Sequence, residues 1–346
     1  MRGTLPFLAV VTIGAMVLGG CATSDTSGRQ SATGDSSVSS VGDGQYPMTV
    51  SFCGQQATVN EEPTRVIAAG RTGVANIVAA GGVDKMVARF GEHGALYSPE
   101  IEEAISPVEQ VAVSGGADHG SISFEKVLGL QPDVIYGSAI GEGDLTLDNL
   151  AANGIVGILP PDSCSYLFPD SAGDFANLDS IPQHVRDVGT FLNTREAAET
   201  SATDMESTLT DARSRGAGLT ELKVAGVYYW DASDDLYAYG GNSTIQGIFN
   251  TASLKNVVDP SYDAMLNGAL SPETILKEDP DVLVVTTGEG GITFEDSMER
   301  LRRIPGMTET TAFKKNQIIE LPSGAAYPTV EAVNATRTVV EQRSAF

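Results

Sequence analysis

The sequence predicts an α/β protein of two similar lobes, each a mostly parallel sheet with flanking helices, joined by one long helix with a ligand cleft between the lobes. Three observations predict this fold class. The chain has 346 residues, which is enough for two domains of ordinary size. Strand-like apolar runs alternate with helical segments, a pattern typical of a parallel sheet covered on both faces. One motif of the first half also recurs in the second half.

The N-terminal segment, residues 1–20, is typical of a signal peptide. Arg2 is followed by an apolar run over Leu5–Leu18 and then by two glycines, and this run is shorter than most membrane spans. Leu18-Gly19-Gly20-Cys21 matches the bacterial lipobox, in which cleavage leaves a cysteine that is lipidated. The alternative is an ordinary secretory signal that ends near a cysteine. The match predicts a lipid anchor on Cys21.

Residues 21–45 are rich in Ser, Thr and Gly and predict a flexible tether between this anchor and an extracytoplasmic body. Outside the cytoplasm, cysteines tend to be oxidised. With Cys21 lipidated, only Cys53 and Cys164 remain, so we expect them to form a disulfide. The alternative is a pair of unpaired, buried thiols.

The first lobe is expected over residues 46–180. Apolar and polar residues alternate on both sides of Cys53-Gly54, which predicts a β-hairpin. The chain then continues with a buried strand, a short helix and a second strand, over 65–70, 72–80 and 86–90.

Residues 181–215 predict the connecting helix, because apolar side chains recur there at helical spacing. The second lobe follows over residues 216–346. It opens with a strand over 222–230 and closes with a helix over 329–344.

The repeated motif is the most informative internal feature. Residues 123–135 and 271–283 each combine a short helix, a Pro-Asp step and an apolar run, and matching positions differ by 148 throughout. Proline disfavours continuation of the helix, and the apolar run suits a central strand. The repeat therefore predicts two similarly built lobes.

Composition excludes several classes of function. Asp and Glu number 45 against 21 Lys and Arg, for a net charge of −24, so nucleic acid is not an expected partner. Three cysteines and three scattered histidines fit neither a disulfide scaffold nor a zinc site, and no resident metal or cofactor is expected. The chain also lacks the G-x-S-x-G, H-E-x-x-H, P-loop and G-x-G-x-x-G motifs of common enzymes.

In order along the chain, these features resemble the substrate-binding lipoproteins of ABC importers, in the helical-backbone class that carries iron–siderophore complexes, haem and cobalamin. The resemblance rests on the lipobox, the tether, Pro63-x-Arg65-Val66-Ile67, both Pro-Asp-Val units, the interlobe helix and the run 238–243. The Cys53-Gly54 and Ser163-Cys164 pair resembles an actinobacterial branch associated mostly with iron–siderophores. The resemblance implies a binding protein that carries out no catalysis, with an ABC permease and a ferric chelate as partners. We expect it to be a monomer.

In that family, one acidic residue on each lobe docks on arginines of the permease, and Glu125 and Glu273 match this motif. A separated pair of carboxylates can orient a two-lobed protein over a symmetric transporter. The alternative is that each glutamate only favours the first turn of its helix through the helix dipole.

The ligand cleft is expected at the carboxyl ends of the sheet strands. Aromatic side chains offer broad apolar contact with a polar tip, and arginine offers donors to an anionic iron chelate. The candidates are Arg71, Arg89, Tyr97, Tyr136, Ser138, Tyr229, Trp230, Tyr237, Tyr239 and Tyr327. Because strand residues alternate between two faces, about half of the run 228–230 must instead belong to the core.

Several alternatives remain open from the sequence. Haem needs an axial ligand, for which His93, His119 and Tyr237 are candidates. Cobalamin is a second ligand carried by the same family. Proteins of another class, an extracytoplasmic enzyme or an adhesion lipoprotein, would turn over a substrate or bind no small molecule in the cleft.

Overall fold

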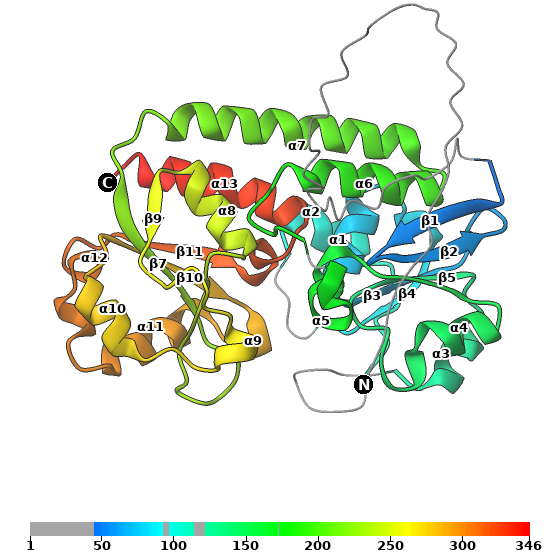
Figure 1. Ribbon diagram of the computed structural model, residues 1–346, viewed down its shortest axis with the longest axis horizontal. Coiled ribbons are helices and arrows are strands. Elements are labelled where there is room, and N and C mark those ends of the chain that lie inside the picture. Colours follow the sequence, from blue (N-terminus) through cyan, green and yellow to red (C-terminus); the bar gives the residue numbers. More distant parts are fainter. Residues whose placement is uncertain (1–44, 93–96, 114–121, 172) are drawn as a thin grey trace, which may run out of the picture. The chain divides into compact units, whose positions relative to one another are not determined.

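The computed structural model describes residues 45–92, 97–113, 122–171 and 173–346 (Figure 1). The predicted signal peptide, Cys21 and almost all of the tether lie outside the described residues, as do His93 and His119. Among the helices that the structure describes, none is long and apolar enough to cross a membrane.

The first lobe is built on a parallel sheet with the strand order β4-β3-β5-β6. The predicted hairpin, β1–β2, precedes this sheet, and Cys53 and Gly54 at its turn both have positive φ angles. Every residue of β3 and β5 is buried, because the sheet is covered on both faces. The strands are β1 Met48–Phe52, β2 Gln55–Val59, β3 Val66–Ala69, β4 Met86–Phe90, β5 Val134–Gly137 and β6 Val156–Ile158. The helices are α1 Gly70–Ala79, α2 Pro99–Ile105, α3 Phe124–Leu130, α4 Leu147–Ala152 and α5 Pro161–Leu167.

The second lobe repeats this strand order. Its parallel sheet runs β9-β7-β10-β11, so that in both lobes the strands stand in the order second, first, third, fourth, and β8 adds an antiparallel edge to β7. The strands are β7 Leu222–Tyr228, β8 Tyr237–Ala238, β9 Leu254–Asn256, β10 Val282–Thr287 and β11 Ile318–Pro322. The helices are α8 Thr244–Thr251, α9 Ala264–Asn267, α10 Pro272–Glu278, α11 Phe294–Arg303, α12 Thr311–Lys314 and α13 Val330–Arg343. The two mostly parallel, helix-covered sheets confirm the predicted fold class.

The Pro-Asp step of the repeat has the same structural role in both lobes. The Asp133 carboxylate accepts hydrogen bonds from the backbone N–H groups of Thr64 and Arg65, at 2.7 and 3.1 Å, and the Asp133 N–H donates to the Arg65 carbonyl. Asp281 binds Lys223 in the same way, with both bonds at 3.0 Å. Each aspartate therefore holds the start of the neighbouring central strand, β3 or β7, which explains why the step recurs.

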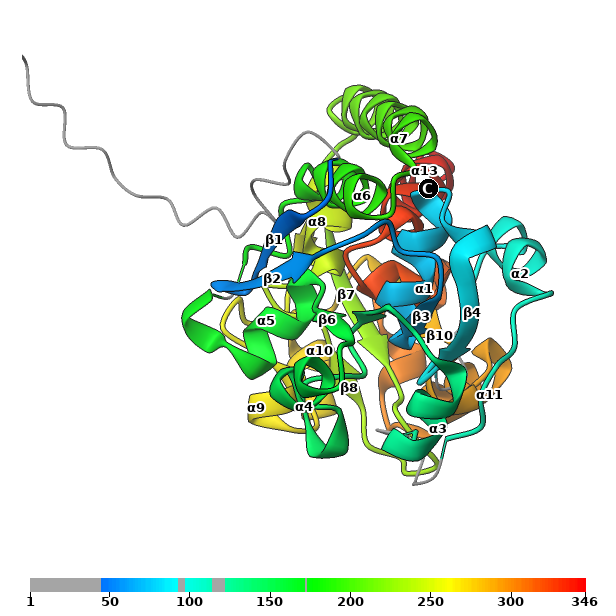
Figure 2. The same ribbon diagram turned by 90° about the vertical axis from the view of Figure 1, so that its right-hand side faces the viewer.

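The connecting element differs from the prediction of one helix over 181–215, which was wrong. The chain forms two helices, α6 Ser180–Phe191 and α7 Arg195–Gly216, that pack side by side (Figures 1 and 2). Asn193 has a φ of 58°, a left-handed conformation that ends α6 and reverses the chain. The packing is close, because a Cβ on Gly189 would lie 2.2 Å from the Cβ of Ala198. Both helices carry apolar residues at the same spacing, so the sequence pattern hides the break.

One hydrophobic core continues from the first lobe into the second. It includes Ile67 of the first sheet, Leu209 of α7, Val284 of the second sheet and Val339 of α13, and a smaller core lies on the other face of the second sheet. Helix α13 packs against α7 and α8, and also against α1 and α6. Because this core is continuous, the lobe limits at 46–180 and 216–346 stay a prediction.

Candidate functional site

A cavity of about 700 Å³ lies between the carboxyl ends of the two parallel sheets. Its first-lobe wall includes Arg71, which follows β3, and Ser138, which follows β5. Its second-lobe wall includes Glu289, which follows β10, and Tyr327, which follows β11. The volume is within the range of small-molecule sites, and the position is where open α/β sheets bind ligands.

Four of the ten predicted ligand residues line this cavity: Arg71, Ser138, Trp230 and Tyr327. Trp230 is the only tryptophan of the chain. That these four contact a ligand stays a prediction.

Two predicted ligand residues lie in the core instead. Tyr136 is 2% exposed and packs against Phe191, since both faces of β5 are covered. Tyr229, also 2% exposed, belongs to the core beneath the second sheet, and Arg300 stacks on its ring. Both Tyr229 and Trp230 follow the end of β7 at Tyr228, and only Trp230 lines the cavity.

Tyr237 and Tyr239 form a stack with Tyr228, a residue absent from the predicted set. The Tyr228 ring lies 5.5 Å from that of Tyr237 and 4.8 Å from that of Tyr239. The Tyr239 hydroxyl is 2.6 Å from Oγ1 of Thr286, and burial raises the pKa of Tyr239 well above its usual value. None of the three is among the residues that line the cavity.

Arg89 and Tyr97 belong to a neighbouring polar cluster on the first lobe. Nη1 of Arg89 lies 2.7 Å from both carboxylate oxygens of Glu92, a side chain that is 3% exposed. The Tyr97 hydroxyl also donates to Glu92, at 3.3 Å. Both predicted residues thus contact one buried carboxylate, Glu92, which was not among the predicted site residues.

Arg71 is held by a carboxylate from the opposite lobe. Its two terminal nitrogens each lie 2.5 Å from an oxygen of Glu289, and both side chains are 9% exposed. Arg71 also donates to the Tyr327 hydroxyl, and its guanidinium lies 4.6 Å from the Tyr327 ring centroid. This bidentate ion pair bridges the cavity, and it is formed by residues 218 apart in the sequence.

A second carboxylate, Asp162, lies at the start of α5 on the first-lobe wall. Its Oδ2 accepts a hydrogen bond from Oγ1 of Thr72 at 2.7 Å, and burial raises the pKa of Asp162. Oδ1 of Asp162 and the hydroxyl of Ser163 are buried and have no hydrogen-bond partner within the described part of the chain. The wall at α5 therefore offers unused polar atoms to a ligand.

The rim of the cavity carries exposed apolar side chains from both lobes. Tyr166 of α5 is 63% exposed and Met265 of α9 is 66% exposed, and both line the cavity. Leu266, next to Met265, is 84% exposed. A ligand that fills the cavity would cover part of this apolar surface.

The predicted disulfide between Cys53 and Cys164 is present, and it joins cysteines 111 residues apart. Cys164 lies in α5, directly after Asp162 and Ser163. The bond therefore fastens the cavity wall at α5 to the β1–β2 hairpin.

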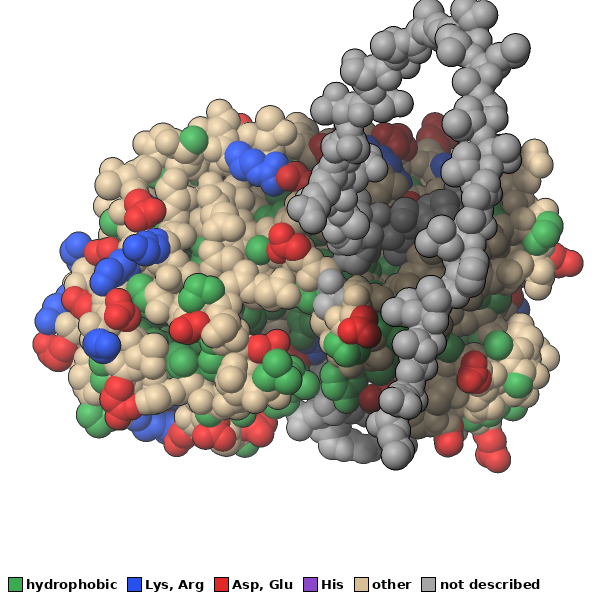
Figure 3. Space-filling view, in the orientation of Figure 1, with side chains coloured by type: hydrophobic (Ala, Val, Ile, Leu, Met, Phe, Trp, Pro, Cys, Tyr) green, Lys and Arg blue, Asp and Glu red, His purple; other side chains and the backbone are tan. Residues whose placement is uncertain are grey.

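The two predicted docking residues are exposed and occupy equivalent places. Glu125 lies in the first turn of α3 and Glu273 in the first turn of α10. Hydrogen bonding by the Ser271 hydroxyl lowers the pKa of Glu273, which keeps this side chain charged. On the face shown in Figure 3, acidic side chains lie along the lower edge of both lobes.

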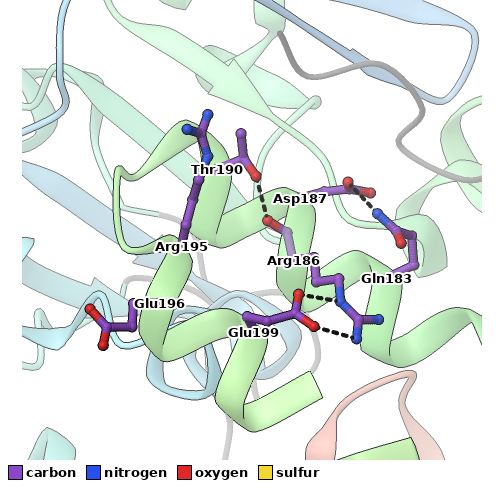
Figure 4. A pocket seen from close by; sticks show the side chains of 7 residues that line it. All are labelled: Gln183, Arg186, Asp187, Thr190, Arg195, Glu196 and Glu199. Carbon is purple, nitrogen blue, oxygen red and sulfur yellow. Dashed lines mark hydrogen bonds and ion pairs between the residues drawn. The ribbon is translucent and has the colours of Figure 1, made fainter. Parts of the chain in front are cut away.

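A second hollow lies on the α6–α7 hairpin and is lined by side chains of these two helices (Figure 4). Two of its charged residues are paired with each other, since Arg186 binds Glu199 at 2.7 Å, and Arg186 also binds Glu206 at 2.6 Å. Gln183 donates to Oδ1 of the buried Asp187 at 2.9 Å. This hollow belongs to the connecting hairpin alone, whereas the interlobe cavity gathers residues from both lobes.

The described residues contain no group of three or more His, Cys, Asp or Glu side chains placed to hold a metal ion. Two haem-ligand candidates, His93 and His119, lie outside the described residues, and the third, Tyr237, is not among those that line the cavity.

The sequence model of a family described as periplasmic binding protein matches residues 57–325. No curated protein matches the chain.

Among solved structures, an ABC-type Fe³⁺-hydroxamate transport system protein from Saccharomonospora viridis is 22% identical, with a TM-score of 0.67, covering 86% of this chain and 99% of that one. A periplasmic haem-binding protein from Roseiflexus sp. is 21% identical, with a TM-score of 0.61 and coverages of 82% and 100%. A periplasmic vitamin B12 binding protein from Vibrio cholerae is 20% identical, with a TM-score of 0.57 and coverages of 82% and 97%. These likenesses establish a shared fold.

Proposed function

Because the chain belongs to the periplasmic binding protein family, we propose that it captures an iron–siderophore complex outside the cytoplasm and delivers it to an ABC permease. The observation that carries this proposal is the cavity of about 700 Å³ between two sheets of matching strand order, lined by Trp230, Tyr327 and Arg71. The matched structures are named for binding or transport, which favours a binding protein over an extracytoplasmic enzyme or an adhesion lipoprotein.

The test is a fluorescence titration of the soluble form that begins at Ala22. Trp230 lines the cavity and is the only tryptophan, so its emission reports on this site alone. The panel contains ferric hydroxamate, catecholate and citrate chelates, haem and cobalamin, with each iron-free chelator as a control for inner-filter effects. We expect saturable one-to-one quenching by a ferric chelate. Saturation by haem or cobalamin alone would replace the siderophore in this proposal, and no response to any of them would refute it.

The proposed anchor is the lipid on Cys21, and the tether over 21–45 would let the body reach a permease in the same membrane. In the native host, full-length protein should fractionate with membranes and incorporate a labelled fatty acid. Cys21→Ser should abolish both properties and leave ligand binding intact. Membrane association that survives this substitution would contradict lipid anchoring at Cys21.

Docking is proposed for Glu125 and Glu273, which are exposed at equivalent positions of the duplicated unit. Replacing either with arginine should reduce uptake about tenfold or more, because a complementary charge becomes a repulsive one. Ligand affinity of the isolated protein should not change. Glu102→Arg, at another exposed glutamate on α2, is the control and should leave uptake normal. Loss of uptake in the control as well would refute a specific role for the pair.

A further inference from the structure

The charges that line the interlobe cavity are unbalanced. Among the described lining residues there is a single cation, Arg71, against four carboxylates: Glu142, Asp144, Asp162 and Glu289. The cavity therefore presents an excess of negative charge to any ligand.

The arginines of this region are already neutralised. Glu289 binds Arg71 through two contacts of 2.5 Å, and Glu92 binds Arg89 through two contacts of 2.7 Å. An anionic group that bound Arg71 would have to displace the Glu289 carboxylate and leave it buried and unpaired, which is energetically costly. Both predicted arginines are therefore ion-paired, and contact between them and an anionic chelate would require these pairs to break.

Two polar atoms of the cavity wall remain without a partner in the described part of the chain: a carboxylate oxygen, which accepts, and a hydroxyl, which can accept or donate. Oδ1 of Asp162 and the hydroxyl of Ser163, a residue that is 6% exposed, have no partner among the described residues, although both residues line the cavity. A buried carboxylate oxygen without a donor is unfavourable, and a cationic donor is the group that would satisfy it best.

We propose that the cavity selects a ferric chelate of zero or positive net charge and that Asp162 and Ser163 receive a cationic group of this ligand, such as a primary ammonium. This inference rests on the proposed function and narrows its ligand class. A ferric complex of three hydroxamates is neutral, because three singly charged groups balance the metal, and a pendant amine makes it cationic. Ferric complexes of three catecholates, and haem with its propionates, are anionic and are disfavoured.

The test uses three ligands that share one ferric trihydroxamate core. These are ferric desferrioxamine B, which ends in an ammonium, its N-acetylated form, which is neutral, and its N-succinylated form, which ends in a carboxylate. We expect the cationic chelate to bind at least as tightly as the neutral one, and the anionic chelate to bind about tenfold more weakly or worse. Raising the salt concentration should reduce this difference, because salt screens charges near a solvent-accessible rim.

Two variants test which carboxylates produce the preference for cationic over anionic chelates. Asp162→Asn keeps an acceptor for Thr72 and should bring the affinities for the cationic and anionic chelates closer, by about tenfold in their ratio. Glu142→Gln at the rim should have the same effect to a smaller degree. Asp148→Asn is the control, since Asp148 is exposed on α4 and does not line the cavity. Circular dichroism and thermal melting establish that each variant folds.

The outcomes separate the two proposals. If the succinylated chelate binds as tightly as the ammonium form, or if neither Asp162→Asn nor Glu142→Gln changes the ratio, the charge inference is wrong and the proposed function stands. If no ferric chelate of any charge binds, the proposed function fails and the inference fails with it.

Discussion

Asp187 predicts a strong dependence of stability on pH. It lies in α6 beside the hollow of Figure 4, it is 6% exposed, and its Oδ2 has no partner among the described residues. The side chain of Gln183 binds only Oδ1. Burial raises the pKa of Asp187 from 3.8 to about 7, because the charged form loses more hydration than its surroundings return.

The direction of this pH dependence follows from the protonation of Asp187 in the folded and unfolded states. Below pH 3.8 Asp187 is protonated in both states, so its burial costs no ionisation energy. Between pH 3.8 and about 7 the unfolded chain releases this proton while the folded chain keeps it, so the free energy of unfolding falls. The difference of about three pKa units corresponds to about 4 kcal/mol, and this loss is complete above pH 7.

Asp187→Asn removes the ionisation and keeps the shape of the side chain. Relative to the wild type, we expect it to raise the free energy of unfolding by up to about 4 kcal/mol at pH 8 and by only about 1 kcal/mol at pH 4.5. Urea unfolding of the soluble form, followed by circular dichroism at both pH values, measures this difference. Asp148→Asn, on an exposed carboxylate, is the control. A stabilisation of the same size at both pH values would refute the reasoning.

Two further predictions concern the cavity walls. Glu289→Gln should lower the free energy of unfolding by about 3 to 5 kcal/mol, because it leaves Arg71 buried without a counter-charge. The double variant Arg71→Met/Glu289→Gln should lose less stability than the sum of the two single variants. A double-mutant cycle measured by urea unfolding tests this. Additive losses would contradict coupling between the two side chains. Replacing Cys53 and Cys164 with serine should lower the free energy of unfolding by about 4 to 5 kcal/mol, as expected for a closed loop of this length, and should weaken ligand binding at α5. Unchanged stability and affinity would show that the bond does not support this wall.

Much of the fold could be predicted from local sequence patterns. The motif that recurs at an offset of 148 residues predicted two matching lobes. In both copies, the aspartate after proline accepts a backbone hydrogen bond from a residue at or beside the start of the neighbouring central strand. The break at Asn193 was missed, because the apolar spacing of α6 continues into α7 without interruption. Asparagine is common where a helix ends and threonine where one begins, so Asn193-Thr194 was the sequence signal for this break.

The site was predicted less completely, for reasons of geometry. The rule that ligand residues follow strand ends found Arg71 and Ser138, and the same rule applied to β10 would have found Glu289. That Glu289 neutralises Arg71 could not be foreseen, because the pair joins residues 218 apart. Tyr136 was misplaced because β5 is covered on both faces, and strand alternation cannot then distinguish a cavity residue from a core residue.

The continuous core has a consequence for transport kinetics. Helix α13 of the second lobe is fastened to the first lobe, where the backbone N–H of Ser98 donates to the buried Glu331 at 2.9 Å. Lobes joined in this way have little freedom to rotate apart, so the surfaces around Glu125 and Glu273 would be nearly the same in loaded and empty protein. If the proposed docking through Glu125 and Glu273 holds, both forms would compete for the permease with similar affinity. Uptake would depend on the loaded fraction, and an excess of empty protein would slow it.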